Sequence, residues 1–129
     1  MARALAEAAW TEPAGAVLGT ARYASPEQAN GQAATGKSDV YSLALVLVEA
    51  VTGHVPFATD TTLSTLRARV DADLSVGDEL GPLAEVLEWA GRSDPTERPD
   101  ASQFRDALGE VAGRVGPAEP LPLAGAFPV

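Results

Sequence analysis

The sequence predicts an all-α fold, and three observations support this prediction. First, residues 43–51 are apolar apart from Glu49, with helix start and stop signals on either side. Second, the segments 83–90 and 101–115 repeat apolar residues at the three- and four-residue spacing of amphipathic helices. Third, proline and glycine interrupt the chain between these segments, as is typical of loops. We therefore expect amphipathic helices around one apolar central helix.

Residues 1–36 carry little periodic pattern and predict a loop, with a helical turn or two within 2–10. One short helix is expected at 25–29. Ser25 can cap its first turn, Pro26 suits the first helical position, and Gly31 follows its end.

The central helix is expected to run from Asp39 to Val51. Ser38 can cap it, Asp39 suits the positive end of its dipole, and Gly53 is a favoured residue just past a helix end. Because its apolar residues lie all round the helix, the pattern predicts burial on every side.

Three further helices are expected within a helical unit at 37–115, and a proline-rich extended tail follows at 116–129. Together these helices can cover about half of the central helix. Leu43, Leu45, Leu47 and Val48 therefore cannot all be buried, which predicts loose packing or self-association. The expected helices begin at Thr61 or Thr62, Leu83, and Ala101 or Ser102, and end at Val70, Ala90 and Val115.

Composition excludes several classes of function. The net charge of −9 argues against nucleic acid or an anionic membrane as partner. The absence of cysteine excludes disulfides, thiolate metal sites and a cysteine nucleophile, and the single His54 cannot form a zinc site alone. The longest apolar run, residues 43–48, is far below the roughly 20 residues that span a bilayer. We therefore expect a soluble, cytoplasmic protein without a metal site.

Two carboxylates need partners. Glu49 lies inside the apolar helix, where its charge must be paired or face water. Glu27 and Arg98 each lie between prolines and small residues in irregular segments, and a bidentate pair would tie these segments together. The spacing of 71 residues alone leaves this pairing open.

Three ordered motifs resemble bacterial, actinobacterial-type serine/threonine protein kinases. Residues 19–28 (GTARYASPEQ) resemble the end of the activation segment. Residues 38–43 (SDVYSL), followed by Glu49 and by TGHVPF at 52–57, are similar to the central C-lobe helix and the turn after it. Residues 94–99 (DPTERP) resemble the late arginine motif of the family. The resemblance implies the distal part of a kinase C-lobe, comprising the activation-segment end within 1–36 and about four helices.

The resemblance also implies roles for individual residues. Glu27 and Arg98 would form a buried ion pair that anchors the activation segment. Asp39 would hydrogen-bond the backbone of the catalytic loop. The substrate pocket would include Thr20, which faces the catalytic aspartate, together with Tyr23 and Glu49, of which Glu49 would contact a basic substrate side chain.

This sequence also departs from the family pattern. It contains no Gly-rich loop, no β3 lysine with its glutamate partner, no His-Arg-Asp loop and no Asp-Phe-Gly aspartate. The resemblance therefore implies that the N-lobe is absent, that no catalytic residue lies in this chain, and that the ATP and magnesium of the family are not bound by it. Ala14 and Glu12 stand where many relatives have activation-loop threonines, which leaves Thr11 as the candidate phosphorylation site.

Two hypotheses about function follow. The chain is a fragment of a serine/threonine kinase that is inactive by itself, or it is a stand-alone helical binding module that pairs with a complete kinase or with its substrates. A small regulatory domain with chance similarity is a third, weaker reading. The expected partners are protein substrates, a complete kinase, or a second copy through the exposed apolar helix.

Overall fold

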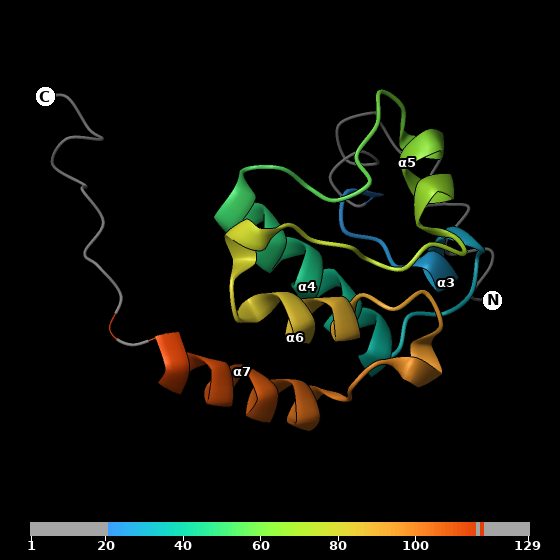
Figure 1. Ribbon diagram of the computed structural model, residues 1–129. Coiled ribbons are helices and arrows are strands. Elements are labelled where there is room, and N and C mark those ends of the chain that lie inside the picture. Colours follow the sequence, from blue (N-terminus) through green and yellow to red (C-terminus); the bar gives the residue numbers. More distant parts are fainter. Residues whose placement is uncertain (1–20, 116, 118–129) are drawn as a thin grey trace, which may run out of the picture.

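The computed structural model describes residues 21–115 and 117 of the chain. These residues form helices and no strands, which confirms the all-α prediction (Figure 1). None of the helices in this part of the chain is both long and apolar enough to span a membrane. The elements are α3 (Pro26–Ala29), α4 (Gly36–Thr52), α5 (Thr62–Arg69), η1 (Asp78–Leu80), α6 (Leu83–Ala90), η2 (Pro95–Glu97) and α7 (Ala101–Val115).

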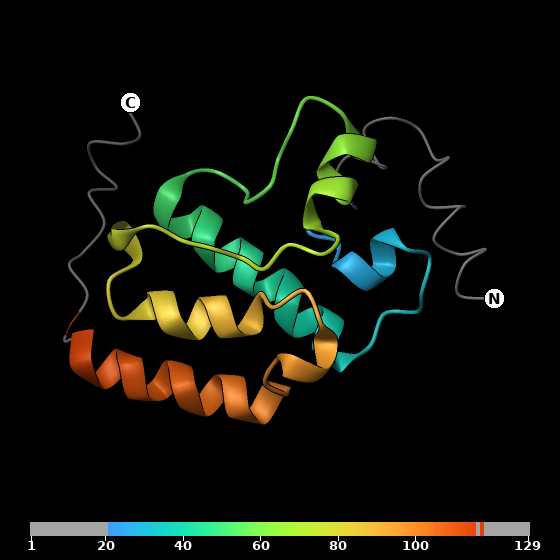
Figure 2. The ribbon, with the colours of Figure 1, turned by 45° about the vertical axis from the view of Figure 1, so that its right-hand side comes forward.

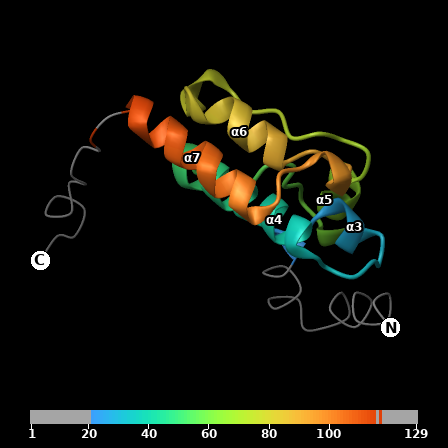
Figure 3. The same ribbon diagram turned by 90° about the horizontal axis from the view of Figure 1, so that it is seen from below.

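Helix α4 forms the centre of the arrangement. Helices α6 and α7 pack against it and against each other, and the two short turns η1 and η2 also contact it (Figure 2). Seen from below, α7 lies alongside both α4 and α6 (Figure 3). Helices α3 and α5 pack against each other at the end of the molecule where α4 begins.

The start of α4 differs from the prediction. The N-cap is Thr35 rather than Ser38, and the helix begins at Gly36. Ser38 is the third helical residue, and its hydroxyl accepts a hydrogen bond from the Thr35 backbone N–H at 3.0 Å. The helix ends at Thr52, one residue beyond the expected Val51. Gly53 follows it as expected, with a φ of 83° in the left-handed region that glycine adopts without steric cost.

The prediction that α4 is buried on every side is wrong. Its inner face is buried, but Leu43 is 45% exposed and Val46 is 41% exposed. Helices α6 and α7 cover the inner face, and α5, which was expected to share in this cover, packs chiefly on α3. The expectation that the four large apolar residues cannot all be covered holds, since Leu45 and Val48 are buried and Leu43 is not.

The main core joins α4 to the segments that follow α5. Helices α6 and α7 begin and end within the ranges expected from sequence. Gly91 ends α6 in close contact with Leu74, where a Cβ on Gly91 would lie 2.3 Å from the Leu74 Cβ. The buried members of this core are Val40, Tyr41, Ala44, Leu45, Val48, Leu74, Leu80, Leu87, Ala90 and Phe104.

Candidate functional site

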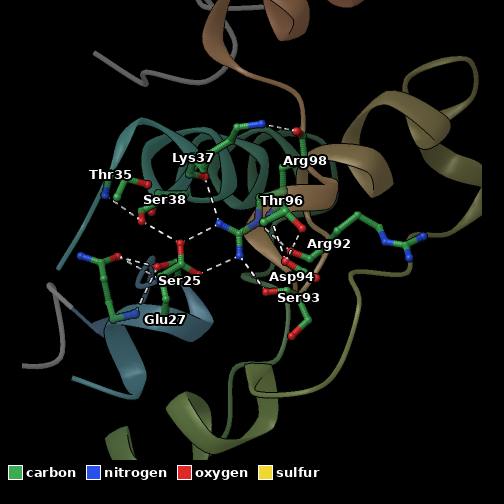
Figure 4. A network of polar contacts seen from close by, with 12 residues as sticks. Ser25, Glu27, Thr35, Lys37, Ser38, Arg92, Ser93, Asp94, Thr96 and Arg98 are labelled. Carbon is green, nitrogen blue, oxygen red and sulfur yellow. Dashed lines mark hydrogen bonds and ion pairs between the residues drawn. The ribbon is translucent and has the colours of Figure 1, made fainter. Parts of the chain in front are cut away.

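Glu27 and Arg98 meet in the interior, 71 residues apart in sequence. Arg98 Nη1 donates to Glu27 Oε2 at 2.7 Å, and Arg98 Nη2 donates to Glu27 Oε1 at 2.8 Å (Figure 4). Glu27 lies in the first turn of α3, which Ser25 caps as predicted. Both residues are buried, so this bidentate pair fixes α3 to the segment between α6 and α7.

The remaining donors of Arg98 bind backbone carbonyls. Nε donates to Arg92 O at 2.7 Å, Nη1 also donates to Lys37 O at 3.0 Å, and Nη2 also donates to Ser93 O at 3.0 Å. The five N–H donors of the guanidinium are therefore all used. In return, Lys37 Nζ donates to the carbonyl of Arg98 at 2.6 Å, which closes the network onto the start of α4.

The surroundings of Glu27 favour its charged form. Burial alone would raise the pKa of the Glu27 carboxyl, but the hydrogen bonds from Arg98 and Ser38 outweigh it and hold the pKa below its ordinary value. The Ser38 hydroxyl donates to Glu27 Oε2 at 2.7 Å. Arg98 also lies over the ring of Tyr41, with its Cζ 4.7 Å from the ring centroid, a cation–π geometry.

Tyr23 and Glu49 also lie together. The Tyr23 hydroxyl donates to Glu49 Oε1 at 2.6 Å, and Arg22 Nη2 donates to Glu49 Oε2 at 2.8 Å. The Glu49 side chain is 26% exposed and that of Arg22 is 46% exposed, so the cluster borders solvent. The hydrogen bond to Glu49, assisted by desolvation, raises the pKa of the Tyr23 hydroxyl. Glu49 thus finds partners for both carboxylate oxygens within the chain.

Sequence reasoning missed Arg69, the last residue of α5. Its side chain is fully buried, and its guanidinium donates to the carbonyls of residues 21, 22, 24 and 56. Among the described residues, no carboxylate forms an ion pair with it. The available signal was its position on one helical face with Thr65 and Leu66, which are also buried.

Of the other predicted site residues, the structure describes Asp39, which lies outside these contacts. Asp39 is exposed on α4, and its side chain makes no hydrogen bond to another described residue. Thr20 and Thr11 lie outside the described residues. Within residues 21–115 and 117, no group of three histidine or acidic side chains is arranged to hold a metal ion.

The chain belongs to the protein kinase domain family. The family model "Protein kinase domain" matches residues 3–107. The chain is 38% identical over 127 residues to serine/threonine-protein kinase PknL of Mycobacterium tuberculosis, covering 95% of this chain and 31% of that protein. It is 37% identical over 118 residues to serine/threonine-protein kinase PksC of Streptomyces coelicolor, covering 87% of this chain and 21% of that protein. The chain thus spans a third or less of these curated relatives.

A solved structure shows the same fold. The twitchin kinase region of Caenorhabditis elegans superimposes with a TM-score of 0.60 at 22% sequence identity, over 80% of this chain and 18% of that one. Together with the family match, this superposition identifies the helices described here as part of a protein-kinase C-lobe.

Proposed function

We propose that residues 1–129 supply the distal, substrate-facing part of the C-lobe of a serine/threonine protein kinase. One observation carries the proposal: the bidentate contact of Glu27 with Arg98 holds an activation-segment-like stretch against the helices that follow it. In a complete enzyme of this family, such a stretch presents the protein substrate, and ATP with magnesium supplies the phosphoryl group that is transferred to a serine or threonine hydroxyl.

Within this proposal, residues 1–36 act as the activation-segment end, residues 37–115 as the helical support, and residues 116–129 as a tail. Tyr23 and Glu49, together with Thr20, form the substrate pocket. Asp39 anchors the catalytic loop of the complete enzyme, which agrees with its exposure on α4. Thr11 is the proposed phosphorylation site, and the proposed location is the cytoplasm.

We further propose that the 129-residue chain is not itself a catalyst. Phosphoryl transfer depends on positioning and on electrostatic stabilisation of the transferred group. The sequence contains none of the family motifs that bind the nucleotide and its magnesium or supply the catalytic aspartate.

A nucleotide titration tests this proposal. Calorimetric titration of the purified chain with ATP and magnesium is expected to give no specific heat, and incubation with a serine/threonine peptide is expected to give no phosphopeptide. Micromolar ATP binding would contradict the assigned roles. The DNA upstream of Met1 is the complementary test. An open frame that encodes the missing kinase motifs supports the proposal, and a stop codon with its own ribosome-binding site supports the alternative.

The alternative is a stand-alone helical module that pairs with a complete kinase or with its substrates. One observation favours it: a largely apolar groove of about 360 Å³ lies between α4 and α7, lined by Val40, Leu43, Phe104 and Leu108 among others. Co-purification of the tagged chain with a complete kinase domain tests this reading. A Leu43→Gln variant should abolish the co-purification, because it places a polar group in the groove.

A further inference from the structure

We propose that Arg69 is a positioning residue that sets the backbone shape of residues 21–24 and thereby the placement of Arg22 and Tyr23 against Glu49. The effect of Arg69 on substrate affinity rests on the proposed function above. The hydrogen bonds from Arg69 to the backbone do not depend on the proposed function.

The geometry of the guanidinium supports this role. Nη1 donates to Ala21 O at 2.8 Å and to Ala24 O at 2.9 Å, while Nη2 donates to Arg22 O and, at 3.2 Å, to Pro56 O. Three carbonyls from four consecutive residues therefore converge on one buried cation. Carbonyl oxygens crowded together in this way repel one another unless donors lie between them, and a charged donor forms the stronger hydrogen bonds.

The fourth carbonyl of this stretch, that of Tyr23, accepts a hydrogen bond from helix α4. The Ser42 hydroxyl of α4 donates to Tyr23 O at 2.5 Å. All four carbonyls of residues 21–24 thus accept from two side chains, one on α5 and one on α4. The apolar contacts of the stretch come from the buried Ala21 and Ala24 and from the partly buried Tyr23. The hydrogen bonds add fixed positions for the four carbonyl oxygens.

Arg69 also connects this stretch to the turn after α4, because Nη2 contacts Pro56 O as well as Arg22 O. Residues 21–24, helix α5 and the turn at residue 56 meet at a single side chain. Removal of the guanidinium would release the backbone of residues 21–24, which positions the Arg22 and Tyr23 side chains. The Glu27–Arg98 pair, which lies beyond this stretch in the sequence, would remain intact.

Amide hydrogen exchange on the 129-residue chain tests the contact. Arg69→Met is expected to raise the exchange rate of the amides at 22–25 about tenfold or more, because the carbonyls of residues 21, 22 and 24 lose the hydrogen bonds that they accept from a charged donor. The exchange rates of the amides in α6 and α7 are expected to change by less than about twofold. Arg69→Lys should restore part of the protection, since lysine keeps the charge and three donors. Arg67→Met is the matched control, because Arg67 is exposed on the same helix.

If Arg69→Met fails to fold, Arg69→Lys decides the question. Faster exchange confined to residues 21–25 supports the proposal. Equal acceleration throughout α6 and α7, or no difference from Arg67→Met, overturns it.

Steady-state kinetics test the consequence for substrate. In a complete kinase domain whose distal part is residues 1–129, Arg69→Lys should raise KM for a peptide substrate about fivefold or more, while kcat and the KM for ATP stay within about twofold. An unchanged peptide KM overturns the positioning role. Absence of activity in the wild-type domain would instead contradict the proposed function. The conclusion from hydrogen exchange about the contact between Arg69 and the backbone would still hold.

Discussion

Replacement of Arg98 by methionine should destabilise the chain more than removal of any surface charge. The substitution keeps most of the aliphatic stem but leaves the buried Glu27 carboxylate without its cation. Breaking a buried ion pair in this way costs about 3–5 kcal/mol of unfolding free energy. Three backbone carbonyls, of residues 37, 92 and 93, lose a donor in the same step. The total stability of a domain is about 5–15 kcal/mol, so the loss should be large on that scale.

The matched control is the exposed pair of Arg114 and Glu110 on α7. Its N–O distance of 2.8 Å resembles that of the buried pair, but both side chains are more than 60% exposed, at 63% and 69%. Surface pairs contribute about 0.2–1 kcal/mol, so Arg114→Met should change the unfolding free energy by less than about 1 kcal/mol. The surface pair lacks the burial, the second hydrogen bond to the carboxylate and the backbone contacts of Arg98, so the comparison measures what these features contribute together.

Urea denaturation followed by far-UV circular dichroism measures both variants. Arg98→Met should lower the urea concentration at the unfolding midpoint without changing the dependence of the unfolding free energy on urea concentration. The double variant Glu27→Ala/Arg98→Met should cost at least about 1 kcal/mol less than the sum of the single variants, because the second change removes the stranded charge. A shift for Arg98→Met no larger than that for Arg114→Met, or strict additivity in the double variant, would refute the reasoning.

Three further outcomes are expected. Because the pKa of Glu27 is lowered by folding, its stabilising contribution is fully present above its ordinary pKa of about 4.3 and is lost as pH falls through the lower folded value. The difference in unfolding free energy between wild type and Glu27→Gln should therefore narrow below about pH 4, and a constant difference would contradict the pairing. Gly91→Ala should destabilise the chain by about 1–3 kcal/mol through overlap with Leu74, whereas Gly109→Ala, with open space at its Cβ, should stabilise α7 by about 0.5–1 kcal/mol. Finally, the chain should bind a hydrophobic dye and show a molecular mass that rises with concentration, because the outer face of α4 exposes apolar side chains. Leu43→Gln should weaken both the dye binding and the self-association. A monomer that binds no dye would contradict this expectation.

The elements that could be predicted are those set by local signals. The ends of α6 and α7 follow from apolar spacing and from the flanking glycine and proline, and both agree with the structure. The predicted start of α4 lies three residues after the observed one, because two hydroxyl residues, Thr35 and Ser38, can both cap a helix there. The packing of α5 was wrong for a different reason: helical spacing shows that a helix forms, but it does not show which neighbour covers its apolar face.

The contacts of the candidate site likewise include some that the sequence predicts and others that it does not. A carboxylate within an apolar helix must find a partner, so a contact at Glu49 could be expected from sequence, but the identity of its two donors could not. The motif resemblance suggested that Glu27 and Arg98 meet, which spacing alone left open. Arg69 was missed because arginine is almost never fully buried without an acidic partner, and here backbone carbonyls take that place.

Two buried arginines, Arg69 and Arg98, fix the backbone of the stretch from residue 21 to residue 27. Apolar contacts also contribute, because Ala21, Ala24 and Pro26 are buried and Tyr23 packs partly against the main core. Apolar contacts are also non-directional and would tolerate a sliding backbone. Hydrogen bonds from Arg69 and Arg98 require particular oxygen positions, so they fix the stretch at both ends although residues 22–25 form no regular helix or strand. An irregular segment held by directional contacts can keep its side chains free for a partner, and this is the property that the proposed substrate-facing role requires.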